Sequence, residues 1–220
     1  MIKKILLSVF AVCTMAAFAS AEIGVGARMG FSADKSNMKD YEQITPITSS
    51  DYNNLKGFIF GAEVLFEKEG LFNMAENHSF GLKAGIDANL KEDVELKSGV
   101  IANNIEISSQ SIMVPVSVYY RYSPEPGQGM SYYVGGGAAW VMTSFKGEGP
   151  IYDIDETDSK VSPFINAGTE YRFNKLFALG LDLRYLFSAK METEKITFNG
   201  EKLKRDMTGF SGAVTARFYF

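Results

Sequence analysis

The sequence predicts an all-β fold, an eight-stranded antiparallel up-and-down transmembrane β-barrel. Eight segments alternate apolar and polar residues with a period of two, which is typical of strands whose two faces meet different surroundings. The composition favours sheet over helix, since 17 Phe, 11 Tyr and 1 Trp accompany 21 Gly among 220 residues. Long and short connections alternate between the segments, as they do in barrels of bacterial outer membranes.

Apolarity and charge exclude two broad classes of protein. With 46% hydrophobic and 22% charged residues, the chain is too apolar to remain disordered. Its formal net charge is -4, so no excess of positive charge is left to meet phosphates. We therefore expect a folded protein without a nucleic-acid partner.

The start of the chain has the three parts of a secretory signal peptide. Met1 to Lys4 form a short positive region, residues 5–19 are mostly apolar, and Ala19-Ser20-Ala21 supplies the small residues of a cleavage site. The alternative is a membrane anchor, but about 15 apolar residues fall short of the roughly 20 that span a bilayer. We therefore expect cleavage between Ala21 and Glu22.

Cleavage at this position would define two regions, a signal peptide at residues 1–21 and a barrel domain at residues 22–220. Cys13, the single cysteine, lies in the first region. The mature chain would therefore contain no disulfide and no thiol chemistry.

The eight predicted strands follow one another along the barrel domain. They lie at residues 23–31, 58–67, 80–90, 111–122, 132–142, 165–173, 177–188 and 210–220. In the first four, the apolar face consists of the odd-numbered residues from Ile23 to Phe31 and the even-numbered residues from Phe58 to Phe66, Phe80 to Leu90 and Ile112 to Tyr122. Glycine, serine and charged residues dominate the opposite face.

The last four segments follow the same rule. The fifth is the least regular, because Gly135-Gly136-Gly137 blurs a face that carries Tyr132 and Trp140. The apolar faces of the other three consist of Ile165, Ala167, Tyr171 and Phe173; the odd-numbered residues from Phe177 to Phe187; and Phe210, Val214, Ala216, Phe218 and Phe220.

The large volume of the side chains on the apolar faces indicates whether these faces point inward or outward. A soluble barrel would turn these faces inward, but an eight-stranded barrel has an interior only just wide enough for side chains. Aromatic residues also gather at both strand ends, which a soluble β-sandwich does not explain. One predicted rim holds Phe66, Phe80, Tyr120, Tyr122, Tyr171, Phe173, Phe177, Phe218 and Phe220, and the other holds Phe31, Phe58, Trp140, Tyr185, Phe187 and Phe210. Two aromatic girdles around an outward apolar band are typical of a transmembrane barrel.

Connection lengths predict the orientation of the barrel. The long connections lie at residues 32–57, 91–110, 143–161 and 188–208. The connections between the other strands are shorter, and Asn174-Lys175 forms the tightest of them. The connection at 67–79 is long for an inner turn, and Leu71-Phe72 there could extend a strand or contact the membrane. We expect the long loops outside the cell and both termini in the periplasm.

The inward positions predict a network of charges in the lumen. Its members are Arg28, Glu63, Lys83, Asp87, Arg121, Glu170, Arg172, Asp182, Arg184 and Arg217, with Glu67 beside them. Buried charges persist when they are paired, so an ion-pair plug is the first interpretation. The alternative is a narrow ion pathway lined by the same groups.

Candidates for catalysis and metal binding are few. His78 is the only histidine, and we expect it in an inner turn beside Ser79, where no catalytic pair forms. Residues 153–158 contain four acidic residues in a predicted loop, without the glycine and final glutamate of a calcium-binding EF-hand loop. Weak divalent bridging to lipopolysaccharide is the alternative to a solvated loop. We expect no enzyme activity, no catalytic residue, no cofactor and no resident metal.

The strand pattern over residues 22–220, behind a signal peptide, resembles small outer-membrane β-barrel proteins of the OmpA/OmpX type. The resemblance implies that Phe218, Tyr219 and Phe220 form the terminal signal read by the barrel-assembly machinery. It implies a bacterial outer-membrane location and contact with membrane lipid and lipopolysaccharide. The peptidoglycan-binding domain of full OmpA proteins has no counterpart in the pattern, so a tethering role is not implied.

The predicted role is structural or surface-interacting: membrane integrity, or adhesion to a host or surface ligand through the long loops. The alternative is a small porin-like channel or a conduit for small or hydrophobic solutes.

Overall fold

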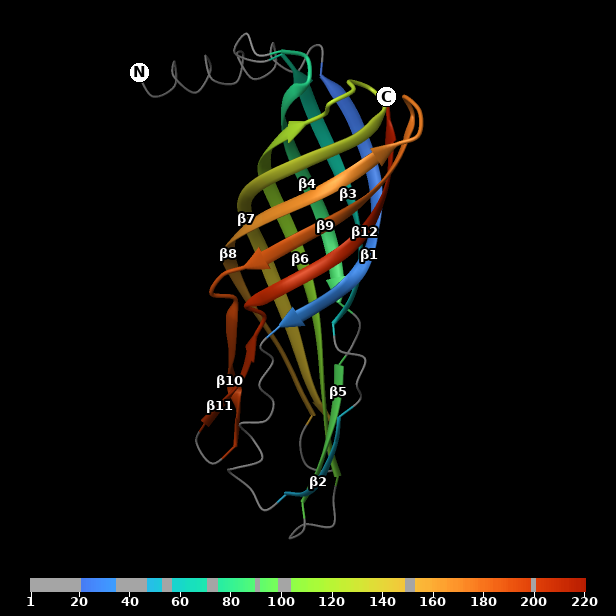
Figure 1. Cartoon of the computed structure of the whole chain (residues 1–220). Coiled ribbons are helices and arrows are strands. Elements are labelled where there is room, and N and C mark those ends of the chain that lie inside the picture. The colour runs from blue at the N-terminus through green and yellow to red at the C-terminus, as the bar shows by residue number, and fades with distance from the viewer. Residues whose placement is uncertain are drawn as a thin grey trace, which may run out of the picture.

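The protein forms a closed antiparallel β-barrel in the computed structural model (Figure 1). The structure describes residues 21–34, 47–52, 57–70, 75–89, 92–98, 104–148, 153–198 and 201–220. Within these residues, no helix is long and apolar enough to cross a membrane. The predicted signal segment before Ala21 and the Leu71-Phe72 connection lie outside the described residues.

Eight strands close the barrel, which confirms the predicted fold class. They are β1 (Glu22–Asp34), β3 (Phe58–Glu69), β4 (His78–Asn89), β6 (Asn104–Tyr122), β7 (Gly129–Glu148), β8 (Asp153–Arg172), β9 (Phe177–Leu186) and β12 (Gly209–Tyr219). Around the ring each strand pairs antiparallel with its neighbours, and the pairings of β1 with β12 and of β6 with β7 close the circle. A closed ladder satisfies the backbone groups that would otherwise face lipid.

Four shorter strands extend the barrel at the end away from the C-terminus (Figure 1). They are β2 (Ile47–Tyr52), β5 (Glu92–Ser98), β10 (Lys190–Phe198) and β11 (Glu201–Asp206). β5 pairs with both β2 and the first part of β6, while β10 and β11 form a separate hairpin. We call this the long-loop end, and the end that carries the C-terminus the terminal end.

The long connections contain more strand than the sequence predicted. β7 and β8 stay paired as far as Glu148 and Asp153, so the acidic segment 153–158 lies in β8 and the predicted loop is wrong. The reason is physical: beyond the membrane both faces of a strand meet water, so no apolar alternation marks the strand although its hydrogen-bond ladder continues.

Short turns at the terminal end hold the strands in register. Asn174 accepts hydrogen bonds from the backbone N–H groups of Leu176 and Phe177 at 2.8 and 2.9 Å, which closes the turn between β8 and β9. Gly127 and Gly129, with φ of 80° and 81°, supply left-handed backbone between β6 and β7. These turns lie at the same end as the start of β1 (Figure 1).

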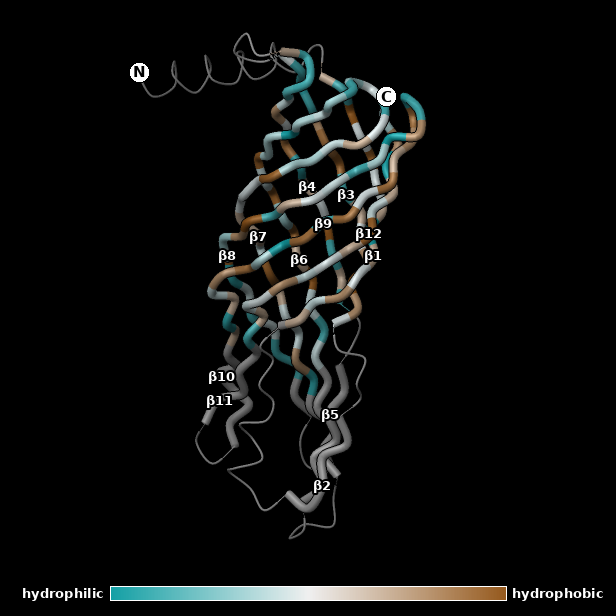
Figure 2. Tube along the Cα trace, viewed as in Figure 1, coloured by the Kyte–Doolittle hydropathy of each residue, from teal (hydrophilic) through white to brown (hydrophobic). Residues whose placement is uncertain are grey.

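The apolar faces point outward, as predicted. Exposed large apolar side chains include Val161, Leu183, Phe31 and Phe218, each more than half exposed. Apolar and polar residues alternate along the barrel strands in Figure 2. Two groups of rings in contact lie at opposite ends of these strands. The terminal end has contacts between Phe173 and Phe177 and between Phe177 and Phe218, while the long-loop end has contacts between Phe31 and Phe58 and between Tyr185 and Phe210.

Candidate functional site: the barrel interior

The interior of the barrel gathers the charged side chains. Successive side chains of a strand point to opposite faces, so strands that turn apolar residues outward turn the residues between them into the lumen. The structure buries the predicted set there: Arg28, Glu63, Lys83, Asp87, Arg121, Glu170, Arg172, Asp182, Arg184 and Arg217. Glu67 is buried with them. These charges come from β1, β3, β4, β6, β8, β9 and β12.

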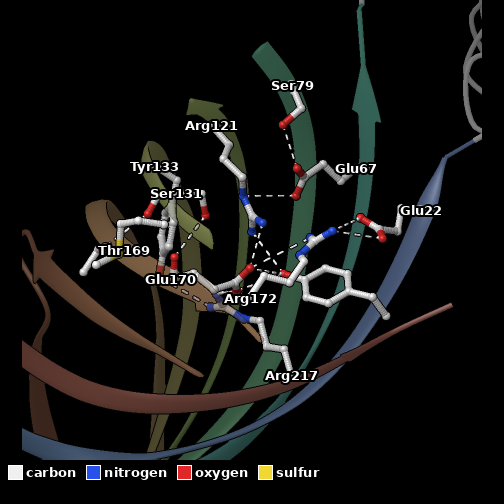
Figure 3. Close-up of polar contacts among 12 residues, drawn as sticks. Glu22, Glu67, Ser79, Arg121, Ser131, Tyr133, Thr169, Glu170, Arg172 and Arg217 are labelled. Atoms are coloured by element: carbon white, nitrogen blue, oxygen red, sulfur yellow. Dashed lines mark hydrogen bonds and ion pairs between the residues drawn. The ribbon is translucent and has the colours of Figure 1, made fainter. Parts of the chain in front are cut away.

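One group of contacts, the Glu170 cluster, centres on the carboxylate of Glu170 on β8 (Figure 3). Arg121 donates to one of its oxygens at 2.8 Å, and Arg217 donates to the other at 2.5 Å. Arg121 also lies 3.2 Å from Glu67, and Arg217 donates to Glu63 at 2.6 Å. Two arginines therefore share three carboxylates, and the contacts join β3, β6, β8 and β12.

A second group, the Asp182 cluster, lies in the middle of the barrel, further from the terminal end than the Glu170 cluster. Asp182 on β9 accepts from Lys83 on β4 at 2.7 Å and from Arg28 on β1 at 3.3 Å. Asp87 on β4 accepts from Arg184 on β9 at 2.7 Å and lies 3.3 Å from Arg28. Because β3, β1 and β12 separate β4 from β9 in the sheet, the contacts between β4 and β9 cross the lumen.

Inward tyrosines complete both clusters. Tyr219 donates to Glu170 at 2.8 Å, and Tyr119 donates to Glu67 at 2.8 Å. Tyr133 on β7 donates to Asp182 at 2.8 Å and accepts from Arg217 at 3.4 Å, so it connects the two clusters. Each of the three rings is buried.

The lumenal role of these tyrosines was not predicted, although their position in the alternation indicates it. Each has the parity of an inward residue on its strand: Tyr119 lies two residues before Arg121, and Tyr219 two after Arg217. Glycines face the rings, and a Cβ at Gly81 would lie 2.3 Å from the Tyr119 ring. A Cβ at Gly168 would lie 2.4 Å from the ring of Tyr133. These inward glycines therefore make room for large side chains in a narrow lumen.

At the terminal end, Arg172 forms the edge of the network. Its guanidinium donates to Glu22 at 3.0 and 3.1 Å and lies 3.9 Å from the centre of the Tyr219 ring. Glu22, the predicted first residue after cleavage, is thus the first residue of β1 and a partner of this arginine. The Arg172 side chain is 9% exposed and that of Glu22 33%, so solvent reaches the network from this end.

Apolar side chains fill the interior at the long-loop end instead. This apolar cluster consists of Met113, Ala139, Val141, Phe164, Leu186, Ala189, Met191 and Met207. The hydroxyl of Thr143 donates to the sulfur of Met191 at 2.9 Å. The cluster was not predicted for two reasons. Met113 and Val141 are apolar residues on the polar face of a strand and look like breaks in the alternation, while Met191 and Met207 lie in the connection predicted at residues 188–208.

The remaining predicted site residues lie apart from the lumen or apart from one another. His78 begins β4, so its predicted place in a turn is wrong; its ring contacts Tyr120 and Tyr122 on the outward side. Ser79 points inward and donates to Glu67 at 2.6 Å, because neighbouring residues of a strand face opposite ways. His78 and Ser79 therefore do not face each other.

In the acidic segment, Asp155 is exposed and lies 3.7 Å from Lys146 of β7. The side chain of Asp153 lies outside the described residues. Among the residues that the structure describes, no group of three or more His, Cys, Asp or Glu side chains could hold a metal ion.

Comparison with known families identifies the class of protein. The family model described as "Outer membrane protein beta-barrel domain" matches residues 5–218. The chain belongs to this family. As a member of the outer membrane protein β-barrel family, it is located in a bacterial outer membrane. A comparison with curated proteins finds no match.

Three solved structures illustrate the similarity of this barrel to known proteins. A major outer membrane protein from Thermus thermophilus is 16% identical with a TM-score of 0.49, over 91% of this chain and 100% of that chain. OprG from Pseudomonas aeruginosa is 12% identical with a TM-score of 0.49, over 91% and 95%. Ail, the attachment invasion locus protein of Yersinia pestis, in complex with the heparin analogue sucrose octasulfate, is 14% identical with a TM-score of 0.47, over 90% and 97%.

Proposed function

We propose that this outer-membrane barrel has a structural and surface-interacting role and that its lumen is plugged by ion pairs. The observation that carries the proposal is the set of contacts across the lumen. Lys83 and Asp87 on β4 pair with Asp182 and Arg184 on β9, on the other side of three intervening strands. A path for ions along the axis would have to separate these pairs.

The cost of separating the pairs supports a closed state. Removing one partner from a buried ion pair typically costs about 3–5 kcal/mol, because an uncompensated charge stays behind in a poorly solvated site. The single carboxylate of Glu170 accepts hydrogen bonds from three side chains, those of Arg121, Arg217 and Tyr219. Several such contacts would have to break together before the lumen could conduct.

The long-loop end supports the surface-interacting part of the proposal. The β-structure continues past the aromatic girdle there, and the described polar residues Lys146 and Asp155 are exposed on it. A polar extension suits contact with lipopolysaccharide or a ligand outside the cell, and through this contact we propose a contribution to membrane integrity. We also propose that the role is not enzymatic, because His78 and Ser79 face opposite sides of β4.

The termini carry two further parts of the proposal. Cleavage between Ala21 and Glu22 would free the residue that pairs with Arg172. The terminal Phe218, Tyr219 and Phe220 would be read by the barrel-assembly machinery before folding. In the folded barrel Tyr219 is buried and bonded to Glu170, whereas Phe218 and Phe220 stay on the outside.

Planar-bilayer recording of the refolded protein tests the plug. We expect no reproducible unit conductance from the wild type, and infrequent openings from Asp182→Asn, which weakens the contacts between β4 and β9. Asp155→Asn, an exposed change of the same kind, is the matched control and should stay silent. Reproducible, ion-selective conductance from the wild type would reject the plug in favour of a small channel.

Attachment assays test the surface role. Cells that display variants shortened at the β10–β11 hairpin or at the ends of β7 and β8 should attach more weakly to a host-cell or abiotic surface. Equal surface amounts, checked by labelling of intact cells, are the control. Unchanged attachment by every shortened variant would reject adhesion.

A further inference from the structure

An apolar hollow lies on the outer surface of the barrel, across β1, β12, β9 and β8. These strands cross the front of the barrel in Figure 1. The hollow has a volume of about 580 Å3, within the roughly 300–1,000 Å3 of ligand pockets. Outward side chains such as Met29, Leu183 and Val214 wall it. Asp182 and its inward neighbours contribute backbone to its floor, because their side chains point into the lumen.

The hollow exists because an outward position lacks a side chain. The register places Gly212 of β12 between Phe31 of β1 and Leu183 of β9. The next outward residues along β12 are Phe210 and Val214, both exposed and bulky. A glycine in the middle of this row therefore leaves a recess among large apolar side chains.

Nothing in the described part of the protein requires a glycine at this position. A Cβ at Gly212 would meet only a methyl group of Leu183, at 3.3 Å, and the backbone is not left-handed there. The inward Gly168 differs, because a Cβ there would overlap the ring of Tyr133. A glycine inside a strand weakens it and often marks the close approach of a ligand or another backbone. The glycine at position 212 therefore suggests that a molecule outside this chain occupies the recess.

We propose that this hollow binds one acyl chain of lipopolysaccharide. Apart from backbone and Thr169, its lining is apolar, so hydrocarbon is the chemistry that fits. Phe31 and Phe58 line its edge and belong to the girdle of the long-loop end, which places the hollow in the leaflet on that side. With the long loops outside the cell, that leaflet is the one that contains lipopolysaccharide.

Shape complementarity, rather than the hydrophobic effect, drives the binding of the acyl chain. The surrounding lipid is as apolar as the hollow, so the attraction comes from van der Waals contact with a recess of fixed form. The inference uses the orientation in the proposed function but not the closed lumen. A conducting wild-type barrel would reject the plug and leave this site unaffected.

The test uses pairs of matched variants in bilayers of lipopolysaccharide and phosphatidylethanolamine. Gly212→Leu fills the hollow, and Gly136→Leu adds the same side chain at another outward glycine, on β7 outside the hollow. Ala167→Leu narrows the hollow from β8 if Gly212→Leu fails to fold, with Ala138→Leu of β7 as its control. Native mass spectrometry after gentle extraction counts the lipids that remain bound.

We expect the wild type to retain one lipopolysaccharide molecule in preference to phosphatidylethanolamine. Gly212→Leu and Ala167→Leu should lower this retention about fivefold, equivalent to about 1 kcal/mol of lost packing. Both control variants should match the wild type. Equal retention by all variants, an equal preference for phosphatidylethanolamine, or a wild-type dimer that Gly212→Leu disrupts would each overturn the proposal.

Discussion

The two halves of the barrel interior are filled in different ways. Toward the terminal end, the Glu170 and Asp182 clusters fill the lumen with charges that each have a specific partner. Toward the long-loop end, the apolar cluster around Val141, Phe164 and Met191 fills it with hydrocarbon and sulfur. The charges come from strands of the closed sheet, whereas the apolar cluster also includes Met191 of β10, which pairs with β11 in a separate hairpin.

Each kind of filling makes a different demand on the sequence. A buried charge needs a partner of opposite sign at hydrogen-bonding distance, so its tolerance to substitution is low. An apolar interior needs the right volume, and changes that conserve volume are tolerated. Substitutions in each half test this difference.

Removing the central carboxylate of the charged half should cost most. Glu170→Ala leaves Arg121 and Arg217 without their shared acceptor, and we expect a loss of about 3–5 kcal/mol in the free energy of unfolding. Urea titration in lipid vesicles measures it through Trp140, the single tryptophan, which lies on the outward face. Glu170→Gln, which keeps an acceptor oxygen but no charge, should lose less. A loss below about 1 kcal/mol for Glu170→Ala would contradict the role of charge pairing.

Crowding in the charged half gives the second prediction. Gly81→Ala places a Cβ against the ring of Tyr119, and overpacking of this kind costs about 1–3 kcal/mol. The same urea titration measures the loss. Gly212→Ala, whose Cβ faces a flexible methyl group outside the barrel, is the matched control and should change stability by less. If the two variants lose equally, the inward glycine is not making room for Tyr119.

Much of this architecture could be predicted because residues that face lipid must be apolar, which gives every membrane-spanning strand an apolar residue at alternate positions. That rule marks all eight barrel strands, and parity then assigns the inward charges. Partners are harder to predict, because they depend on strand tilt and register rather than on residue type. Lys83 and Asp182 meet across the lumen from strands that are distant in sequence and not neighbours in the sheet.

Two regions were harder to predict from the sequence: the strands that continue beyond the lipid, and the part of the interior that contains no charged residues. The first part of β8, around Asp155, has polar residues on both faces, so its alternation does not reveal a strand. Met113 and Val141 occupy inward positions of their strands but are apolar. The prediction expected polar or charged residues at inward positions and therefore did not place these two in the lumen. Tyr133 and Tyr219 also point inward, but the predicted lumen network contained only charged residues and gave these tyrosines no place in it.

The apolar half gives the third prediction, which bounds the tolerance of that region. Met191→Leu conserves volume in a fully buried site, and we expect a loss below about 1.5 kcal/mol. The substitution gives up the polar contact from the Thr143 hydroxyl to the Met191 sulfur. Met191→Ala, which opens a cavity, should cost about 2–5 kcal/mol in the same titration. Similar losses for Leu and Ala would mean that the apolar half is as specific as the charged half.

The smallest effect is expected where a charge pair leaves the interior. Lys146 and Asp155 lie 3.7 Å apart on the extension of β7 and β8, with side chains 56% and 65% exposed. Water and salt screen such a pair, so Lys146→Ala should change the free energy of unfolding by about 0–1 kcal/mol. Raising the salt concentration should abolish that change, whereas the loss in Glu170→Ala should persist because its partners are shielded from solvent. A loss in Lys146→Ala as large and as salt-independent as that in Glu170→Ala would show that burial does not separate the two kinds of pair.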